Sequence, residues 1–160
     1  MSSKAEAALA LFQEQIGSEE GVGEWHRVDQ KQIDLFADAT LDHQFIHVDP
    51  EKAAELSPYK VTIAHGFLTL SMVVHLGGSI PPPNPQAYAG LVMGVNYGLD
   101  RVRFPSPVAV DSRIRARRSL ISAELKSPTT LQITQRVTVE IEGGDKPGCV
   151  ADTLARLIYS

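Results

Sequence analysis

Apolar and polar residues recur with two different periods, which divide the chain into a helical first half and a strand-rich second half. In the first half, apolar residues recur every three or four positions, as they do along helices that bury one face. Polar caps, glycines and prolines set the limits of these segments. We predict helices over 5–16, from the cap Asp29 to about Ala39, over Pro50–Leu56 and over about 66–76.

The stretch 61–80 organises the rest of the chain. It contains no Asp, Glu, Lys or Arg, and its apolar residues point in every direction around a helix. Such a helix must be buried on all sides, either in a protein core or in a membrane. Two histidines and three glycines interrupt the run and no basic flank follows it, so we expect a core helix and no membrane partner.

Strand-like patterns begin after the proline-rich segment 81–85. They predict strands at 88–97, 99–104, 112–120, 129–141 and 150–159, and a short strand, or the approach to one, at 23–28. Helices followed by long antiparallel strands predict an α+β fold in one domain, residues 1–160, with strands mainly at 88–159. A curved antiparallel sheet wrapped around the central helix would bury it, and the free edges of that sheet favour a homodimer.

Composition and charge describe an ordinary globular protein of 160 residues and 17.4 kDa, with 43% hydrophobic and 21% charged residues. The formal net charge of −4 argues against nucleic acid as a general partner. The single Cys149 cannot form an intramolecular disulfide, and the first residues contain no apolar signal-peptide core. We therefore expect a cytoplasmic protein.

The segment 40–48 is predicted to be a loop rich in titratable groups, with Asp42 and His47 as its candidate catalytic pair. A carboxylate and an imidazole can hold a water between them, and one can take its proton while the other donates. The spacing alone favours a solvated loop that ends in the helix cap Asp49. His43 and His47 would share a helix face, but no third ligand lies nearby, so we predict no metal.

The start of the central helix supplies a second candidate group at Gly66. The first N–H groups of a helix have no intrahelical acceptor, and they suit an enolate oxygen that develops negative charge. The alternative is that Gly66 only eases packing against the sheet. Ser71, five residues further on, either bonds its own helix carbonyl or faces a pocket.

Two segments together resemble the MaoC-like dehydratases: residues 36–49, which read FADATLDHQFIHVD, and residues 63–71, which read IAHGFLTLS. This hot-dog-fold family includes the (R)-specific enoyl-CoA hydratases and a nodulation protein N-like branch. Its motif is Gly-Asp-x-Asn-Pro-aliphatic-His-x-Asp, of which this chain keeps Asp42, Ile46, His47 and Asp49 and replaces the others with Leu41, Gln44 and Phe45. The resemblance to the nodulation-N-like branch extends to 96–98 and 101–105.

The resemblance implies a single hot-dog domain that hydrates trans-2-enoyl-CoA reversibly to (R)-3-hydroxyacyl-CoA, a hydro-lyase reaction of fatty acid metabolism. It implies that Asp42 and His47 activate the water, that the Gly66 N–H polarises the thioester carbonyl and that Ser71 lines the pocket. Asn96 either orients the dyad or serves as a turn residue before Gly98. The coenzyme A thioester is then the substrate, and no metal or redox cofactor is expected.

Two other functions are compatible with the same fold: an acyl-CoA thioesterase, and a non-catalytic acyl-thioester-binding module. The sequence leaves open the acyl chain length and the choice between coenzyme A and an acyl carrier protein. Arg113, Arg115 and Arg117 would share one strand face, which is either solvated or in contact with the phosphates of coenzyme A.

Overall fold

The computed structural model describes residues 2–160 and contains six helices, one 3-10 helix and six strands in that range. The helices are α1 (Lys4–Gln13), α2 (Gln30–Thr40), α3 (Phe45–Val48), α4 (Pro50–Leu56), α5 (Gly66–Ser71) and α6 (Val73–Gly78), with η1 (Pro85–Tyr88) after them. The strands are β1 (Glu19–Val22), β2 (His26–Arg27), β3 (Leu91–Arg103), β4 (Arg113–Ser127), β5 (Thr130–Ile141) and β6 (Cys149–Tyr159).

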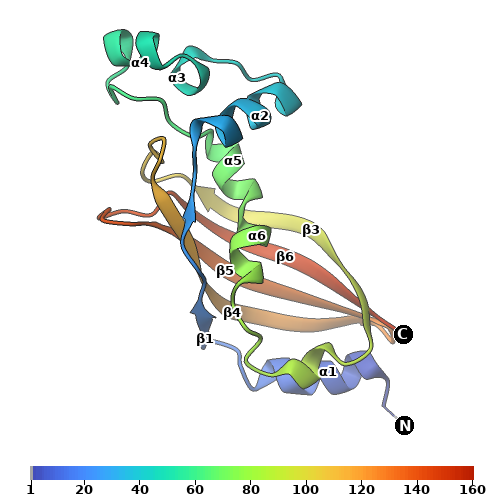
Figure 1. The fold of residues 1–160 in the computed structure, drawn as a ribbon. Helices are drawn as coiled ribbons and strands as arrows, with labels where there is room; N and C mark the ends of the chain where they lie inside the picture. The colour runs from blue at the N-terminus through green and yellow to red at the C-terminus, as the bar shows by residue number, and fades with distance from the viewer. Residues whose placement is uncertain (1) are drawn as a thin grey trace.

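All strands belong to one antiparallel sheet in the order β1-β4-β5-β6-β3 (Figure 1). β2 pairs with the same strand β4 as β1 does, but nearer to the start of β4. Along β5, buried and more exposed residues alternate, so one face of the sheet is covered and the other faces solvent. The predicted α+β class is confirmed, and the last three predicted strands correspond to β4, β5 and β6.

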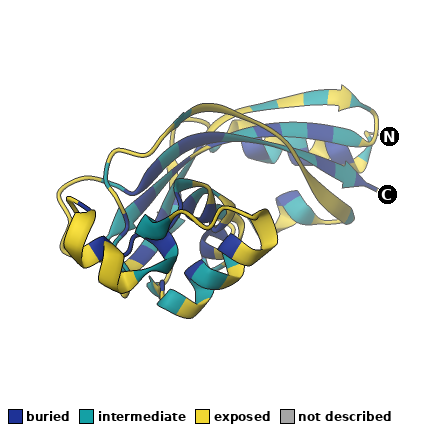
Figure 2. Ribbon diagram, turned by 90° about the horizontal axis from the view of Figure 1, so that it is seen from above, coloured by how far each residue is buried: buried dark blue, intermediate teal, exposed yellow. Residues whose placement is uncertain are grey.

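The stretch 66–78 lies across the covered face of the sheet, as α5 followed by α6 (Figure 1). Leu68, Met72 and Leu76 pack with residues of β4, β5 and β6 in the larger hydrophobic core. The helices of the chain gather on this same side of the sheet, as the view from above shows (Figure 2). This segment is therefore the central element of the fold, as predicted.

Two features of that prediction are wrong. The segment is not one continuous helix, because it divides at Met72, whose N–H contacts the carbonyls of both Leu68 and Leu70. It is also not buried on all sides: Phe67 is 69% exposed and Val74 is 63% exposed. The sheet of one chain covers only one side of the helix, so the apolar residues on the other side remain uncovered.

Local signals placed the other helices well. Asp29 caps α2 by accepting from the N–H of Gln32, and Asp49 caps α4 by accepting from the N–H of Lys52. The N-terminal helix ends at Gln13 rather than at 16, and it covers a second apolar cluster at one end of the sheet (Figure 1). β1 at Glu19–Val22 was not predicted, because its residues lack an alternating pattern.

β3 forms one edge of the sheet, and ten of its residues in a row are exposed. Several of them are large and apolar: Val92, Met93, Val95, Tyr97 and Leu99. An edge strand with free N–H and C=O groups and apolar side chains is a ready site for pairing with another strand. Within residues 2–160, no helix is long and apolar enough to cross a membrane.

Candidate active site

The predicted loop 40–48 is a turn followed by a short helix. Leu41 ends α2 in the left-handed conformation, at φ 64° and ψ 20°, and so takes up the tight turn that the family motif gives to glycine. Asp42 follows this turn and is exposed, whereas His47 lies in the one-turn helix α3, which the prediction of a loop missed. Together, the turn and α3 bring residues five apart to one side of the segment.

His47 is buried, and its hydrogen bond to the main chain fixes its tautomer. Nδ1 lies 2.7 Å from the carbonyl oxygen of Ile63; because a carbonyl can only accept, Nδ1 carries the proton and donates it. In the neutral ring, Nε2 therefore keeps its lone pair. Burial lowers the pKa of His47 below its ordinary value of 6.5, and the hydrogen bond to Ile63 opposes this shift. His47 is thus a neutral base near pH 7.

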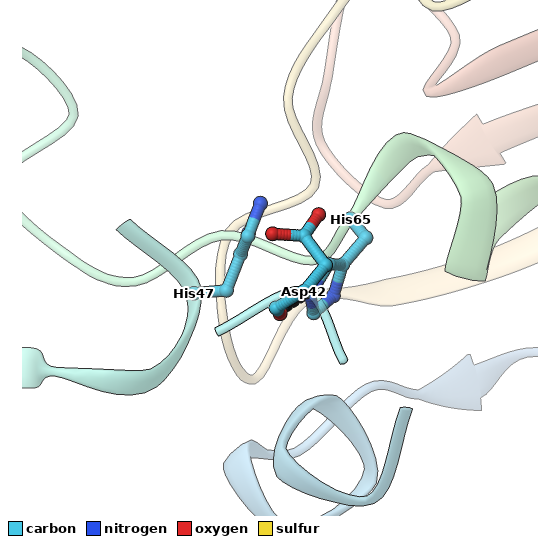
Figure 3. A group of neighbouring side chains, drawn as sticks. All are labelled: Asp42, His47 and His65. Atoms are coloured by element: carbon cyan, nitrogen blue, oxygen red, sulfur yellow. Dashed lines mark hydrogen bonds between the residues drawn. The ribbon is translucent and has the colours of Figure 1, made fainter. Parts of the chain in front are cut away.

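Asp42 and His47 form a cluster with a third residue, His65, the last residue before α5 (Figure 3). One ligand atom from each of the three side chains lies within 4.8 Å of the other two. This spacing allows Asp42 and His47 to share one water molecule. The predicted catalytic pair is therefore brought together by the fold.

His65 holds both members of the pair. Its ring stacks on that of His47, with centroids 3.8 Å apart and an angle of 23° between the planes. Its Nε2 lies 2.9 Å from the carbonyl oxygen of Asp42 and must donate to it, which leaves Nδ1 buried without a partner among the described residues. No role was predicted for His65, although a titratable residue inside an otherwise uncharged stretch was the available signal.

The same three residues are poorly arranged for a metal ion. An imidazole binds a metal in the plane of its ring, and the planes of His47 and His65 are nearly parallel. Their lone pairs therefore do not converge on one point, as a tetrahedral zinc ion requires. The exposed His43 is paired with Asp38 at 2.9 Å and lies outside the cluster.

Gly66 begins α5 and shares a cavity of about 330 Å³ with His47. We call this the site cavity; Tyr59, Thr69 and Phe104 also line it. A Cβ atom at Gly66 would lie only 3.1 Å from the ring of Phe104, so the close approach of that ring favours glycine here. The N-terminal N–H groups of the helix thus lie next to the buried imidazole.

Ser71 and Asn96 lie elsewhere. Both line a second cavity of about 400 Å³ between the α5–α6 segment and strands β3 and β6, and neither Asp42 nor His47 lines it. We call it the middle cavity. The hydroxyl of Ser71 donates to the carbonyl of Phe67 at 2.7 Å, which is the first of the two alternatives considered for it. Asn96 lies within β3 and is not a turn residue.

The arginines of β4 are paired with carboxylates. Arg113 pairs with Glu142, and Arg115 and Arg117 both pair with Glu140 at 2.7 Å. These contacts link neighbouring strands on the outer face of the sheet, which favours a solvated role for this face.

A model of the MaoC like domain matches residues 11–141, most of the chain. The chain belongs to the MaoC-like dehydratase family. It is 50% identical over 147 residues to nodulation protein N of Rhizobium leguminosarum bv. viciae, covering 92% of this chain and 89% of that protein. It is 46% identical over 144 residues to 3-hydroxyacyl-thioester dehydratase Z of Mycobacterium tuberculosis, covering 89% and 90%.

The fold of this MaoC-like chain is also similar to that of an R-hydratase of Pseudomonas aeruginosa solved in the unliganded form. The TM-score is 0.66 at 19% identity, and the match covers 91% of this chain and 83% of the other. The predicted hot-dog fold is thereby confirmed, as is the family that the two sequence segments indicated.

Proposed function

We propose that this protein catalyses the reversible hydration of trans-2-enoyl thioesters to (R)-3-hydroxyacyl thioesters, with coenzyme A as the carrier. One observation carries the proposal: the ligand atoms of Asp42 and His47 lie within 4.8 Å of each other, and His47 shares the site cavity with the first residue of α5, Gly66. A relative that is 46% identical and is named a 3-hydroxyacyl-thioester dehydratase supports the same reaction.

The proposed chemistry begins with a water held between Asp42 and His47. Nε2 of His47 takes a proton from the water, and the oxygen of that water forms a bond to C3 of the substrate. The π electrons of the C2–C3 double bond move toward the thioester carbonyl, whose oxygen becomes negatively charged and is stabilised by the N–H of Gly66. C2 of this enolate then takes a proton from the dyad, which completes the addition of water. The dehydration follows the same steps in reverse.

These steps need neither a metal nor a redox cofactor, because the reaction moves only protons and one water molecule. The low pKa of His47 keeps its ring neutral and able to accept a proton near pH 7. Asp42 is exposed and does not line the site cavity, but its carboxylate lies within 4.8 Å of His47, close enough to hold a water for the buried ring.

The proposal includes a homodimer in which β3 pairs with β3 of a second copy. The exposed apolar residues of β3 and the exposed Phe67 and Val74 of the central segment support it. A second copy would cover these side chains and complete the burial of the α5–α6 segment, which the sheet of one chain leaves half uncovered.

A steady-state assay with crotonyl-CoA tests the reaction by following the loss of enoyl absorbance together with the release of free thiol. We expect hydration without thiol release and an (R)-3-hydroxy product. Asp42→Asn should reduce kcat by about 10²- to 10⁴-fold, the usual contribution of an acid–base group. Asp38→Asn is the matched control, because this neighbouring carboxylate pairs with His43 outside the cluster. Thiol release without hydration would identify a thioesterase instead.

A further inference from the structure

A third cavity extends the middle cavity toward the C-terminal end of α6. It has a volume of about 220 Å³, and we call it the distal cavity. The two cavities share Val73, Val74, Asn96 and Thr153, so they form one groove between the helical segment and the sheet. The distal cavity ends at Gly77, Arg118 and Gln135.

The groove lies along the same helical segment that begins at the proposed site, and Thr69 of the site cavity and Leu70 of the middle cavity are neighbours in the chain. Positions three or four residues apart share a helix face, and this face carries Gly66, Leu70, Val73 and Gly77. Gly66 lines the site cavity, and Gly77 lines the distal cavity. Eleven residue steps at about 1.5 Å each separate these two glycines by about 16 Å. With C–C bonds of about 1.5 Å, an extended acyl chain of roughly a dozen carbons spans that length.

The distal end of this groove carries a charged side chain, Arg118, and the amide of Gln135, whereas no charged residue lines its middle. Glu20 of β1 has a side chain that is 1% exposed, and its Oε2 accepts from Nε of Arg118 and from Nε2 of Gln135, each at 2.7 Å. A carboxylate can only accept, so this contact fixes the orientation of the Gln135 amide and leaves its Oε1 as a free acceptor. The guanidinium of Arg118 lines the same cavity as a donor.

This cluster is not saturated by the protein. Oε1 of Glu20 is buried without a hydrogen-bond partner among residues 2–160, and burial of such a group is costly unless a water or a ligand approaches it. A purely structural role explains part of the arrangement, since Arg118 also contacts the carbonyl of Gly77 at 3.3 Å. It leaves the Oε1 of Gln135 and the guanidinium of Arg118 at the end of the groove, next to the buried carboxylate of Glu20.

We propose that the groove binds enoyl thioesters of about twelve carbons whose far end carries a hydroxyl group, and that Gln135 and Arg118 recognise this hydroxyl. The hydroxyl donates to Oε1 of Gln135 and accepts from the guanidinium of Arg118. An anionic end group is excluded, because the charge of Arg118 is already balanced by Glu20. The inference rests on the proposed hydratase function, for which it names the substrate class.

The test compares trans-2-dodecenoyl-CoA with its 12-hydroxy analogue, using crotonyl-CoA as the reference substrate for the reaction itself. The measured quantity is the ratio of kcat/KM for the hydroxylated chain to kcat/KM for the plain chain, so that a general loss of activity cancels. We expect a ratio of about 10 to 100 for the wild-type protein, the usual effect of a hydrogen bond to a charged group.

Gln135→Met keeps the length of the side chain and removes both polar atoms, and it should lower the ratio to one or below. Gln132→Met is the matched control: it makes the same substitution on the same strand, at a residue that lines neither cavity and accepts from Nε of Arg156 at 3.2 Å. Its ratio should equal that of the wild type.

The outcomes separate the inference from the function on which it rests. A wild-type ratio of one or below with active hydration of crotonyl-CoA overturns the inference alone, as does failure to hydrate either twelve-carbon chain. Retention of the wild-type ratio by Gln135→Met also overturns the inference alone. Absence of hydration with every substrate, crotonyl-CoA included, overturns the proposed function as well.

Discussion

Replacing His65 by phenylalanine should separate the stability of this protein from its activity. His65 stacks on His47 at 3.8 Å and contacts Phe36 at 4.9 Å, and a phenylalanine ring can keep both contacts. The substitution removes only the hydrogen bond to the carbonyl of Asp42 and the buried, unpartnered Nδ1. The ring contacts should therefore remain, while the hydrogen bond that positions Asp42 is lost.

The two losses act in opposite directions on the free energy of unfolding. Loss of the hydrogen bond lowers the free energy of unfolding by about 0.5–1.5 kcal/mol. Removal of the unsatisfied Nδ1 of His65 raises it by about 1–3 kcal/mol. The slightly larger ring offsets part of that gain through tighter packing. Because 1 kcal/mol corresponds to about 2–4 °C for a domain of this size, the Tm of His65→Phe should stay within about 4 °C of the wild type.

The activity should fall much further. Without its bond to His65, the exposed turn that carries Asp42 loses a hydrogen bond to a buried residue, and a misplacement of about 1 Å can cost about 10²-fold in rate. We therefore expect kcat to fall by about two orders of magnitude. His65→Gln is the matched variant, because its amide N–H can donate to Asp42 while the aromatic stack is lost.

Hydration of crotonyl-CoA and thermal unfolding should be measured on both variants. His65→Phe should be as stable as the wild type but slow, and His65→Gln should be less stable but faster than His65→Phe. The acid limb of the rate–pH profile should also move to higher pH in His65→Phe, since the neighbouring His65 lowers the pKa of His47. A His65→Phe protein with kcat within twofold of the wild type would refute a positioning role for His65.

Burial lowers the pKa of His47 in the folded chain, so activity should persist below pH 6.5, the ordinary histidine value. The unfolded chain binds more protons in that range, so denaturation should show stability falling as the pH drops below 6.5 and constant above it. Gly66→Ala should lower kcat/KM about tenfold with little change in Tm, because the half-exposed Phe104 can move. Leu99→Lys on β3 should give monomers in sedimentation; an unchanged dimer would refute pairing through this edge.

The sequence by itself determined where α2 and α4 begin and which two residues form the candidate catalytic pair. Asp29 and Asp49 cap helices through contacts with residues three positions later, and such local contacts can be read from the order of residues. Asp42 and His47 were found in the same way, because a short motif carries both of them within one turn of chain. The strand pattern of β4, β5 and β6 is equally local, since it depends on the alternation of each strand.

Only the tertiary structure decided how these groups act. The tautomer of His47 depends on the carbonyl of Ile63, and the place of Asp42 depends on His65, twenty-three residues away in the chain. Glu20, Arg118 and Gln135 come from three strands and meet only because β1, β4 and β5 pair side by side. One side of the central helix likewise stays exposed because the sheet of a single chain covers only the other side. Contacts between distant residues depend on the closure of the whole fold, and no local pattern in the sequence encodes them.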